Sequence, residues 1–133
     1  MAGPGERQVI GPIAPLFIVA SVADAVAFYE RLGFALRYAM PGEEPFFAIV
    51  GRDSVEIHMK AVGDEVAPLP NPVRHEWVAW DAFVFVADPD ALAAEFTGAG
   101  IVLHEPISNR DDGLRGFKIR DADGYVLFFG RPE

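Results

Sequence analysis

The chain repeats one pattern of apolar and polar positions twice. Aligning Gly33 with Gly100 places residues 17–34, FIVASVADAVAFYERLGF, beside residues 84–101, VFVADPDALAAEFTGAGI. In each copy an apolar strand leads to a residue that can cap a helix, then to an amphipathic helix, and then to a glycine. This self-similarity indicates a duplicated structural unit.

The helix signals have the same physical basis in both copies. Ser21 in the first copy and Asp88 in the second have side chains that accept hydrogen bonds from the first N–H groups of a helix. Pro89 has the backbone angle that suits a first helical residue. Gly33 and Gly100 can adopt the left-handed conformation that ends a helix. The sequence therefore predicts one helix in each copy, between the capping residue and the glycine.

After each helix the pattern changes to the alternation of strands. The predicted strands are 35–39, 46–50 and 54–60 in the first copy, and 102–105, 116–120 and 125–130 in the second. Asp123-Gly124 is a strong signal for a tight hairpin turn. We therefore predict an α+β fold of two βαβββ modules, residues 13–61 and 80–131.

The segments outside the modules have a different character. The linker, residues 62–79, contains Pro68, Pro70 and Pro72, and this density of proline predicts an exposed, stiff loop without a helix, such as a lid over a site. Residues 1–12 lack a basic leader and an apolar signal core, so we expect a flexible N-terminal lead. One domain over residues 13–131 follows.

The amino-acid composition limits the kinds of partner that the protein is expected to bind. The 133-residue chain carries a net charge of −9, which disfavours nucleic acid and attracts cations to a cleft. It has no cysteine, which excludes disulfides and thiolate metal sites and fits a reducing cytoplasm. No apolar run has the length of a membrane span. We expect a cytoplasmic protein without a nucleic-acid or membrane partner.

If the sheets curve around a pocket, strand alternation selects the side chains that would line it. In 54–60 three apolar residues face the helix, which turns Glu56 and His58 to the other side. In 80–87 the residues Asp81, Phe83 and Phe85 share one face. The candidate ligand-binding residues are Glu56, His58, Asp81, Phe83, Phe85, Trp77, Trp80, Phe47 and Tyr38.

Several of these candidates have a structural alternative. A carboxylate in an apolar wall needs solvent or a partner. Glu56 can therefore pair with Arg37 or Arg115 instead of a ligand, or form a cross-strand pair with His58. The two tryptophans can equally serve a subunit contact or the core.

Three segments resemble a known family. ADAVAFYERLGF at 23–34, VEIHM at 55–59 and KIRDADGYVLFF at 118–129 resemble the signature helix, fourth strand and closing hairpin of the glyoxalase, bleomycin-resistance and extradiol-dioxygenase superfamily, also called vicinal oxygen chelate proteins. The resemblance covers residues 13 to 131. It implies paired βαβββ modules that form half-barrels around a cavity, and a homodimer whose cavities are built partly by both subunits.

The resemblance also implies where a divalent metal would bind. Counted from the matched helix and turn, the four ligand positions of metal-dependent members fall at Ala14, Glu56, Asp81 and Phe128. Alanine and phenylalanine cannot ligate a metal, and two carboxylates alone make a poor transition-metal site. We therefore expect no metal, no other cofactor and no catalytic residues.

What remains is a binding cavity. The bleomycin-resistance branch implies sequestration of a small molecule, and the aromatic and acidic candidates favour a cationic or aromatic compound such as a bleomycin-like antibiotic. The alternative is an enzyme, a glyoxalase-like lyase or isomerase or a dioxygenase, with a rearranged metal site that uses Glu56 and His58. A structural domain without a ligand also stays open.

Overall fold

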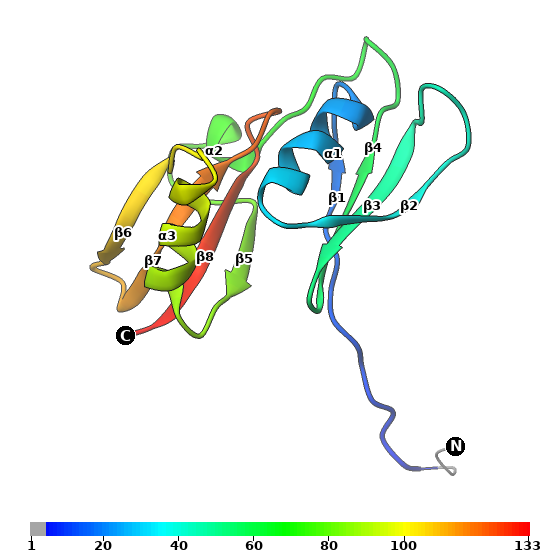
Figure 1. The fold of residues 1–133 in the computed structure, drawn as a ribbon. Coiled ribbons are helices and arrows are strands. Elements are labelled where there is room, and N and C mark those ends of the chain that lie inside the picture. Colours follow the sequence, from blue (N-terminus) through cyan, green and yellow to red (C-terminus); the bar gives the residue numbers. More distant parts are fainter. Residues whose placement is uncertain (1–4) are drawn as a thin grey trace.

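The structure, a computed structural model, describes residues 5–133. Its elements in chain order are β1 (Leu16–Ile18), α1 (Val22–Arg31), β2 (Ala35–Ala39), β3 (Phe47–Arg52), β4 (Val55–Lys60), α2 (Asn71–Arg74), β5 (Ala82–Phe85), α3 (Pro89–Gly98), β6 (Glu105–Asn109), β7 (Leu114–Arg120) and β8 (Val126–Pro132). Of the lead predicted at 1–12, residues 1–4 lie outside the described part. Residues 5–12 contain no helix or strand and extend away from the rest of the chain (Figure 1).

Two four-stranded sheets form, one from each module. The first sheet has the order β1-β4-β3-β2 and the second has the order β5-β8-β7-β6. In each sheet the first strand of the module pairs in parallel with the last one, and the other pairs are antiparallel. The predicted α+β fold of two βαβββ modules is confirmed.

The predicted helix ends are also confirmed. Ser21 accepts a hydrogen bond from the Asp24 N–H, and Asp88 accepts one from the Ala91 N–H. Gly33 and Gly100 have φ angles of 82° and 85°, the left-handed conformation that favours glycine.

Two predicted elements were wrong in detail. The linker contains a short helix, α2, because Pro72 lies in its first turn, where the missing N–H has no helical acceptor to lose. The strand predicted at 102–105 begins only at Glu105. The Ile101 N–H still bonds the Phe96 carbonyl at the end of α3, and pairing with β7 starts at the His104 N–H.

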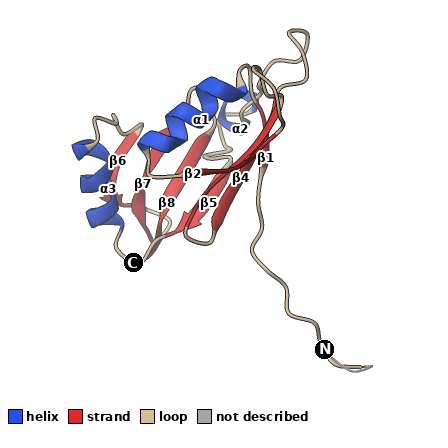
Figure 2. Ribbon diagram, turned by 45° about the vertical axis from the view of Figure 1, so that its right-hand side comes forward, coloured by secondary structure: helices blue, strands red, loops and turns tan. Residues whose placement is uncertain are grey.

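The two modules share one core. The helices α1 and α3 pack on the same side of their sheets (Figure 2). The buried apolar side chains on this side form a single cluster that includes Tyr29 of α1 and Phe96 of α3. We call the opposite face of each sheet its open face, because no helix in residues 5–133 covers it. No helix in this range has the length and apolar character that a membrane crossing requires.

The modules are joined by the hairpin between β7 and β8, which reaches α1. Tyr29 Oη donates to Asp121 Oδ2 at 2.6 Å, and Tyr125 Oη donates to the Ile18 carbonyl at 2.6 Å. Burial is the main reason that the pKa of Asp121 rises to about 6 and that the pKa of Tyr29 lies well above its ordinary value.

Candidate ligand site

The open face of the first sheet carries four of the predicted site residues. His58 lies opposite Ile49 in the β3–β4 register. The Phe47 ring meets the His58 ring edge to face at 5.9 Å and the Tyr38 ring at 6.1 Å. With Glu56 on the same strand face as His58, alternation places these four side chains together as predicted.

Glu56 already has a partner. Its Oε2 lies 3.2 Å from Arg37 Nη1, and its Oε1 lies 3.8 Å from His58 Nε2. The Arg37 side chain crosses the space where a Cβ at Gly51 would lie, so the glycine makes room for the ion pair. Of the two arginines considered from the sequence, Arg37 is therefore the partner, whereas Arg115 pairs with Asp90.

The open face of the second sheet carries a cluster of aromatic rings, which we call the ring cluster. Its centroid distances are 5.5 Å for Trp80–Phe83, 5.1 Å for Trp80–Phe128, 5.1 Å for Phe83–Phe128 and 4.6 Å for Phe83–Phe85. Phe128 is fully buried but lies outside the core cluster of the helix side. Phe85 is 77% exposed. The cluster thus has a buried base and an accessible edge.

Phe128 is not among the ligand-binding residues predicted from the sequence, where it appears only as a position that cannot ligate a metal. Its ring lies where a Cβ at Gly116 or Gly130 would be, so two glycines on adjacent strands create the space for it. Arg110 stacks over the same ring, with its Cζ 5.3 Å from the centroid. Gly116 and Gly130 are both visible in the sequence, but they indicate this space only once the register places them opposite each other in β7 and β8.

Two basic residues of this open face were also missed. Lys118 is 7% exposed and its Nζ lies 3.0 Å from Glu105 Oε2. Arg110 Nη1 lies 2.7 Å from the other oxygen of Glu105, and its Nε lies 3.2 Å from Asp112. The charges on this side of the ring cluster therefore neutralise one another.

Asp81 does not present a free carboxylate to the open face. Its Oδ1 accepts a hydrogen bond from the Asn71 N–H at 2.7 Å, and its Oδ2 accepts one from the Val126 N–H at 2.8 Å. Trp77, four residues earlier, is 84% exposed and stacks edge to face on His75, not on the ring cluster.

The predicted residues thus form two groups, one on each open face, and the N-terminal segment lies between them. A pocket of about 410 Å³ is lined by Ile13 and Pro15 of this segment, by Val55 and Ile57 of β4, and by Phe83 and Phe85 of β5. A neighbouring pocket of about 290 Å³ is lined by Ile13, Ala14, Arg37 and Glu56. Glu56 thus lines one of these two pockets and Phe83 lines the other.

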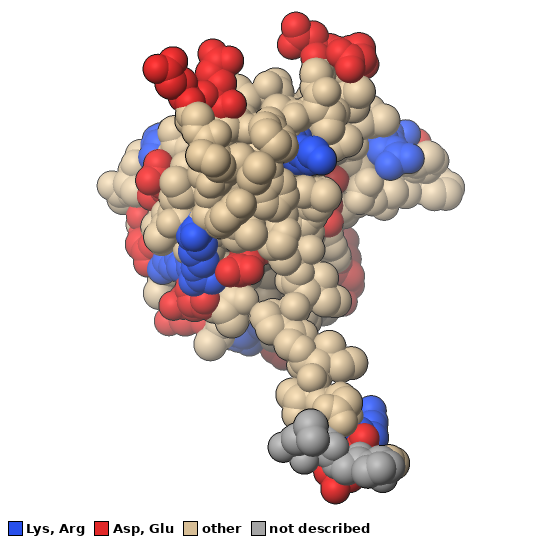
Figure 3. All heavy atoms as spheres, turned by 90° about the vertical axis from the view of Figure 1, so that its right-hand side faces the viewer, with Lys and Arg blue, Asp and Glu red and all other residues tan. Residues whose placement is uncertain are grey.

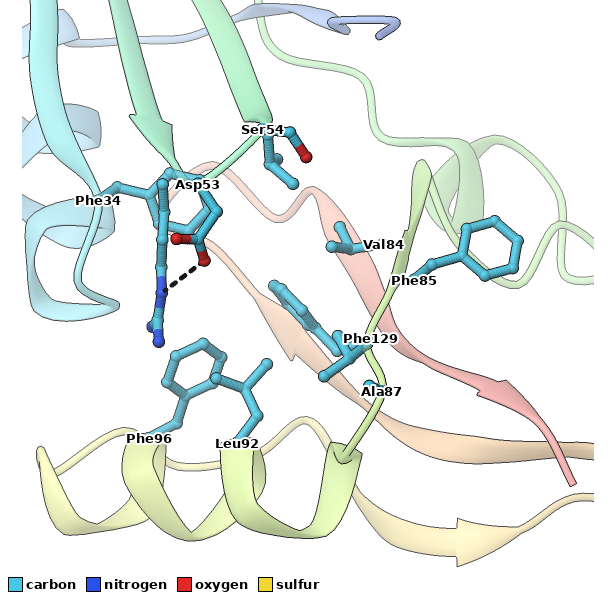
Figure 4. Close-up of a pocket in the computed structure, with 12 residues that line it drawn as sticks. Phe34, Asp53, Ser54, Val84, Phe85, Ala87, Leu92, Phe96 and Phe129 are labelled. Carbon is cyan, nitrogen blue, oxygen red and sulfur yellow. Dashed lines mark ion pairs between the residues drawn. The ribbon is translucent and has the colours of Figure 1, made fainter.

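A further pocket, of about 270 Å³, lies at the seam between the modules (Figure 4). Phe96 and Leu92 reach it from α3, and Phe34 closes the side towards the first module. Its arginine, Arg52, already bonds both oxygens of Glu95 and the Leu32 carbonyl. The arginine of this pocket is therefore already engaged, and the other charged side chain of the lining, Asp53, is exposed and lies 3.9 Å from Arg52 Nε.

The register corrects one count of the metal positions. The module alignment pairs Leu16 with Phe83. Leu16 lies opposite His58, and Phe83 lies opposite Phe128. The residue of the first module that corresponds to Phe128 is therefore His58. The metal-ligand position that the sequence count placed at Glu56 lies two residues further along β4.

The corrected set is Ala14, His58, Asp81 and Phe128. Two of these side chains have no donor atom, and the carboxylate of Asp81 is occupied by backbone N–H groups. The donor set does not fit the divalent metal of the fold family. Within residues 5–133 no group of three or more His, Cys, Asp or Glu side chains is placed to hold a metal ion.

The net charge of −9 is not concentrated on the open faces. Figure 3 shows acidic side chains on two protruding tips, with a largely uncharged surface between them. Exposed acidic pairs lie in the β2–β3 loop, Glu43-Glu44, and in the linker, Asp64-Glu65. Because the open-face carboxylates are all partnered, the geometry gives less support to a cation site than to an aromatic one.

Comparison with known proteins supports the fold of two βαβββ modules. The family model "Glyoxalase/Bleomycin resistance protein/Dioxygenase superfamily" matches residues 10–129. The bleomycin-binding protein from bleomycin-producing Streptomyces verticillus, in complex with copper(II)-bleomycin, is 25% identical, with a TM-score of 0.68 over 96% of this chain and 100% of that one.

Two other solved structures share the fold at lower identity. A bleomycin-binding protein complexed with bleomycin is 18% identical, with a TM-score of 0.71 over 93% of this chain and 100% of that one. A glyoxalase-related enzyme from Clostridium phytofermentans is 16% identical, with a TM-score of 0.72 over 98% and 100%. No curated protein matches the chain.

Proposed function

Because the chain belongs to the glyoxalase/bleomycin resistance protein/dioxygenase superfamily, we propose that it is a metal-free binding protein that sequesters a small aromatic compound, cationic or neutral, such as a bleomycin-like antibiotic. The observation that carries the proposal is the ring cluster, which ends in the exposed ring of Phe85. A large aromatic side chain on a surface that no helix covers favours contact with a ligand or a partner.

The aromatic contacts, more than the charges, support this proposal. Offset or edge-to-face ring pairs contribute about 0.5–1.5 kcal/mol each beyond the area they bury. A flat ligand placed on Phe83 and Phe85 would gain several such contacts. A cationic group would have to compete with Arg37 for Glu56, which limits the selectivity that this carboxylate can give.

We also propose a homodimer in the cytoplasm. Val9, Ile10 and Ile13 of the N-terminal segment are each at least 90% exposed, and Leu16 on the first open face is 58% exposed. A second copy that covers these residues would remove a large apolar area from water and close the open faces into cavities. The cysteine-free chain suits a reducing compartment.

A titration with three probes tests the binding function. The probes are metal-free bleomycin, 1-naphthylmethylamine and its neutral analogue 1-naphthalenemethanol, each followed by calorimetry. The matched variants are Phe85→Ala in the ring cluster and Phe46→Ala on a different edge, where the ring is 50% exposed. We expect Phe85→Ala to weaken binding about tenfold, the loss of one good ring contact, and Phe46→Ala to leave it unchanged. Equal effects of the two variants, or no binding of any probe, would contradict the proposal.

A further inference from the structure

Asp81 closes a loop. The loop runs from Asn71, the first residue of α2, to Asp81, just before β5. One oxygen of the Asp81 side chain accepts the Asn71 N–H at 2.7 Å and the other accepts the Val126 N–H at 2.8 Å. The Asp81 N–H also donates to the Val126 carbonyl at 2.7 Å, so the carboxylate ties the Asn71 end of the loop to Asp81 and adds a second hydrogen bond to the start of β8.

The loop carries the tryptophan of the ring cluster. Trp80 directly precedes Asp81, and its ring lies 5.5 Å from Phe83 and 5.1 Å from Phe128. The capping position of α2 is Pro70, which has no side-chain hydrogen bond to the helix. Asp81 thus supplies from a distance the acceptor that a capping side chain would supply, and ties the first residue of α2 to the residue that follows Trp80.

We propose that Asp81 is a positioning residue that clamps the loop 71–81 and so holds Trp80 against Phe83 and Phe128. The effect on ligand binding, which rests on the proposed function, comes from the position of the ring and not from the charge of the carboxylate. This differs from the role expected from the sequence, in which Asp81 balances the charge of a cation directly.

The chemistry of the clamp explains why an aspartate stands there. Both partners are N–H donors, so the side chain must offer two acceptor atoms. Asparagine offers one acceptor, and its NH₂ group would face one of the N–H groups. Asp81→Asn should therefore break one of the two hydrogen bonds and open one end of the loop, although the asparagine side chain has nearly the same shape as that of aspartate.

A second variant removes the other half of the same hydrogen bond. Asn71→Pro deletes the N–H donor and exchanges the Asn71 carboxamide for an apolar ring, and proline is well tolerated at the first helical position; Asn71→Ala, which keeps the N–H, controls for the lost carboxamide. Pro70 already has φ −59° and ψ 146°, the conformation that a following proline requires. Asp81, its charge and its bond to Val126 stay in place. Asp64→Asn, an exposed position in the same linker, is the control for charge.

The clamp is first tested without a ligand. Amide hydrogen exchange is measured on peptides that cover residues 71–80, and the emission of Trp80 is measured in a Trp77→Phe background, since the chain has two tryptophans. We expect Asp81→Asn and Asn71→Pro to speed exchange about tenfold or more in 71–80 and to shift the Trp80 emission to the red. Wild-type values in both variants would overturn the proposal.

Titration with the naphthyl probes then separates position from charge. We expect both variants to weaken 1-naphthylmethylamine and 1-naphthalenemethanol by the same factor, about tenfold. A loss confined to the amine and to Asp81→Asn, with Asn71→Pro unchanged, would overturn the proposal and show a direct charge contact. If neither probe binds the wild type, the proposed function fails, and the exchange measurement alone still decides the clamp.

Discussion

Replacing Asp121 with asparagine should stabilise the protein relative to the wild type increasingly as the pH rises from about 4 to 8. Asp121 is 7% exposed, and its carboxylate accepts three hydrogen bonds, from the Tyr29 hydroxyl and from the Asp123 and Tyr125 N–H groups. Burial opposes the charged form, and the hydrogen bonds offset only part of this, so the pKa of Asp121 rises from its ordinary value of 3.8 to about 6.

The sign and size of the effect follow from this shift. Because the folded state binds the proton more tightly than the unfolded state, the contribution of Asp121 to stability falls as pH rises from about 4 through about 6. At about 1.4 kcal/mol per pH unit, the loss approaches about 3 kcal/mol. Asparagine has no charge to desolvate. Its oxygen can accept from both N–H groups, and its NH₂ group can donate to the Tyr29 hydroxyl.

The assay is urea unfolding, followed by circular dichroism, of the wild type and Asp121→Asn at a series of pH values. The free energy of unfolding of the variant minus that of the wild type should increase by about 3 kcal/mol between about pH 4 and pH 8. Using the difference cancels the pH dependence of other groups, and Asp111→Asn, at an exposed position, controls for net charge. A difference that is constant, or that decreases with pH, would refute the reasoning.

Three further predictions concern the open faces and the assembly. Gly116→Ala should lower the free energy of unfolding by about 1–3 kcal/mol, since its Cβ would overlap the neighbouring strand. Gly98→Ala, whose Cβ would lie in open space on a helix, should not lower it, and equal free energies of unfolding for the two variants would contradict this. Arg37→Gln should free Glu56 and raise the preference for 1-naphthylmethylamine over 1-naphthalenemethanol about tenfold, whereas Glu56→Gln should abolish any preference; unchanged calorimetric ratios would show that the carboxylate takes no part. The full chain should sediment as a dimer and a chain lacking residues 1–11 as a monomer, and a monomeric full chain would count against the assembly.

The repeated architecture could be predicted from the sequence because its signals are local. Ser21, Asp88, Gly33 and Gly100 each act on the backbone within a few residues, so the pattern alone located both helices. Strand alternation correctly placed Glu56 and His58 on the face away from the helix, because this property depends only on the period of the strand.

The details of the site could not be predicted because they depend on distant pairings. Alternation placed Asp81 on an open face, but its partners are Asn71 and Val126, and the second is far away in sequence. The space for Phe128 is visible only once the register sets Gly116 opposite Gly130. Local patterns thus predict which way a side chain points but not what it meets there.

The contacts that join the modules also constrain how the chain folds as it is synthesised. Three residues of the first module have partners near the end of the chain: Tyr125 stacks on Phe17 and donates to the Ile18 carbonyl, and Asp121 accepts from Tyr29. These partners leave the ribosome about a hundred residues later. At about 5–20 residues per second, the apolar side of the first module then waits for several seconds without its cover. A nascent chain stopped before Asp121 should consequently bind chaperones that recognise exposed apolar surface and resist proteases poorly. The last hairpin to be synthesised thus supplies the contacts that complete the packing of the first module.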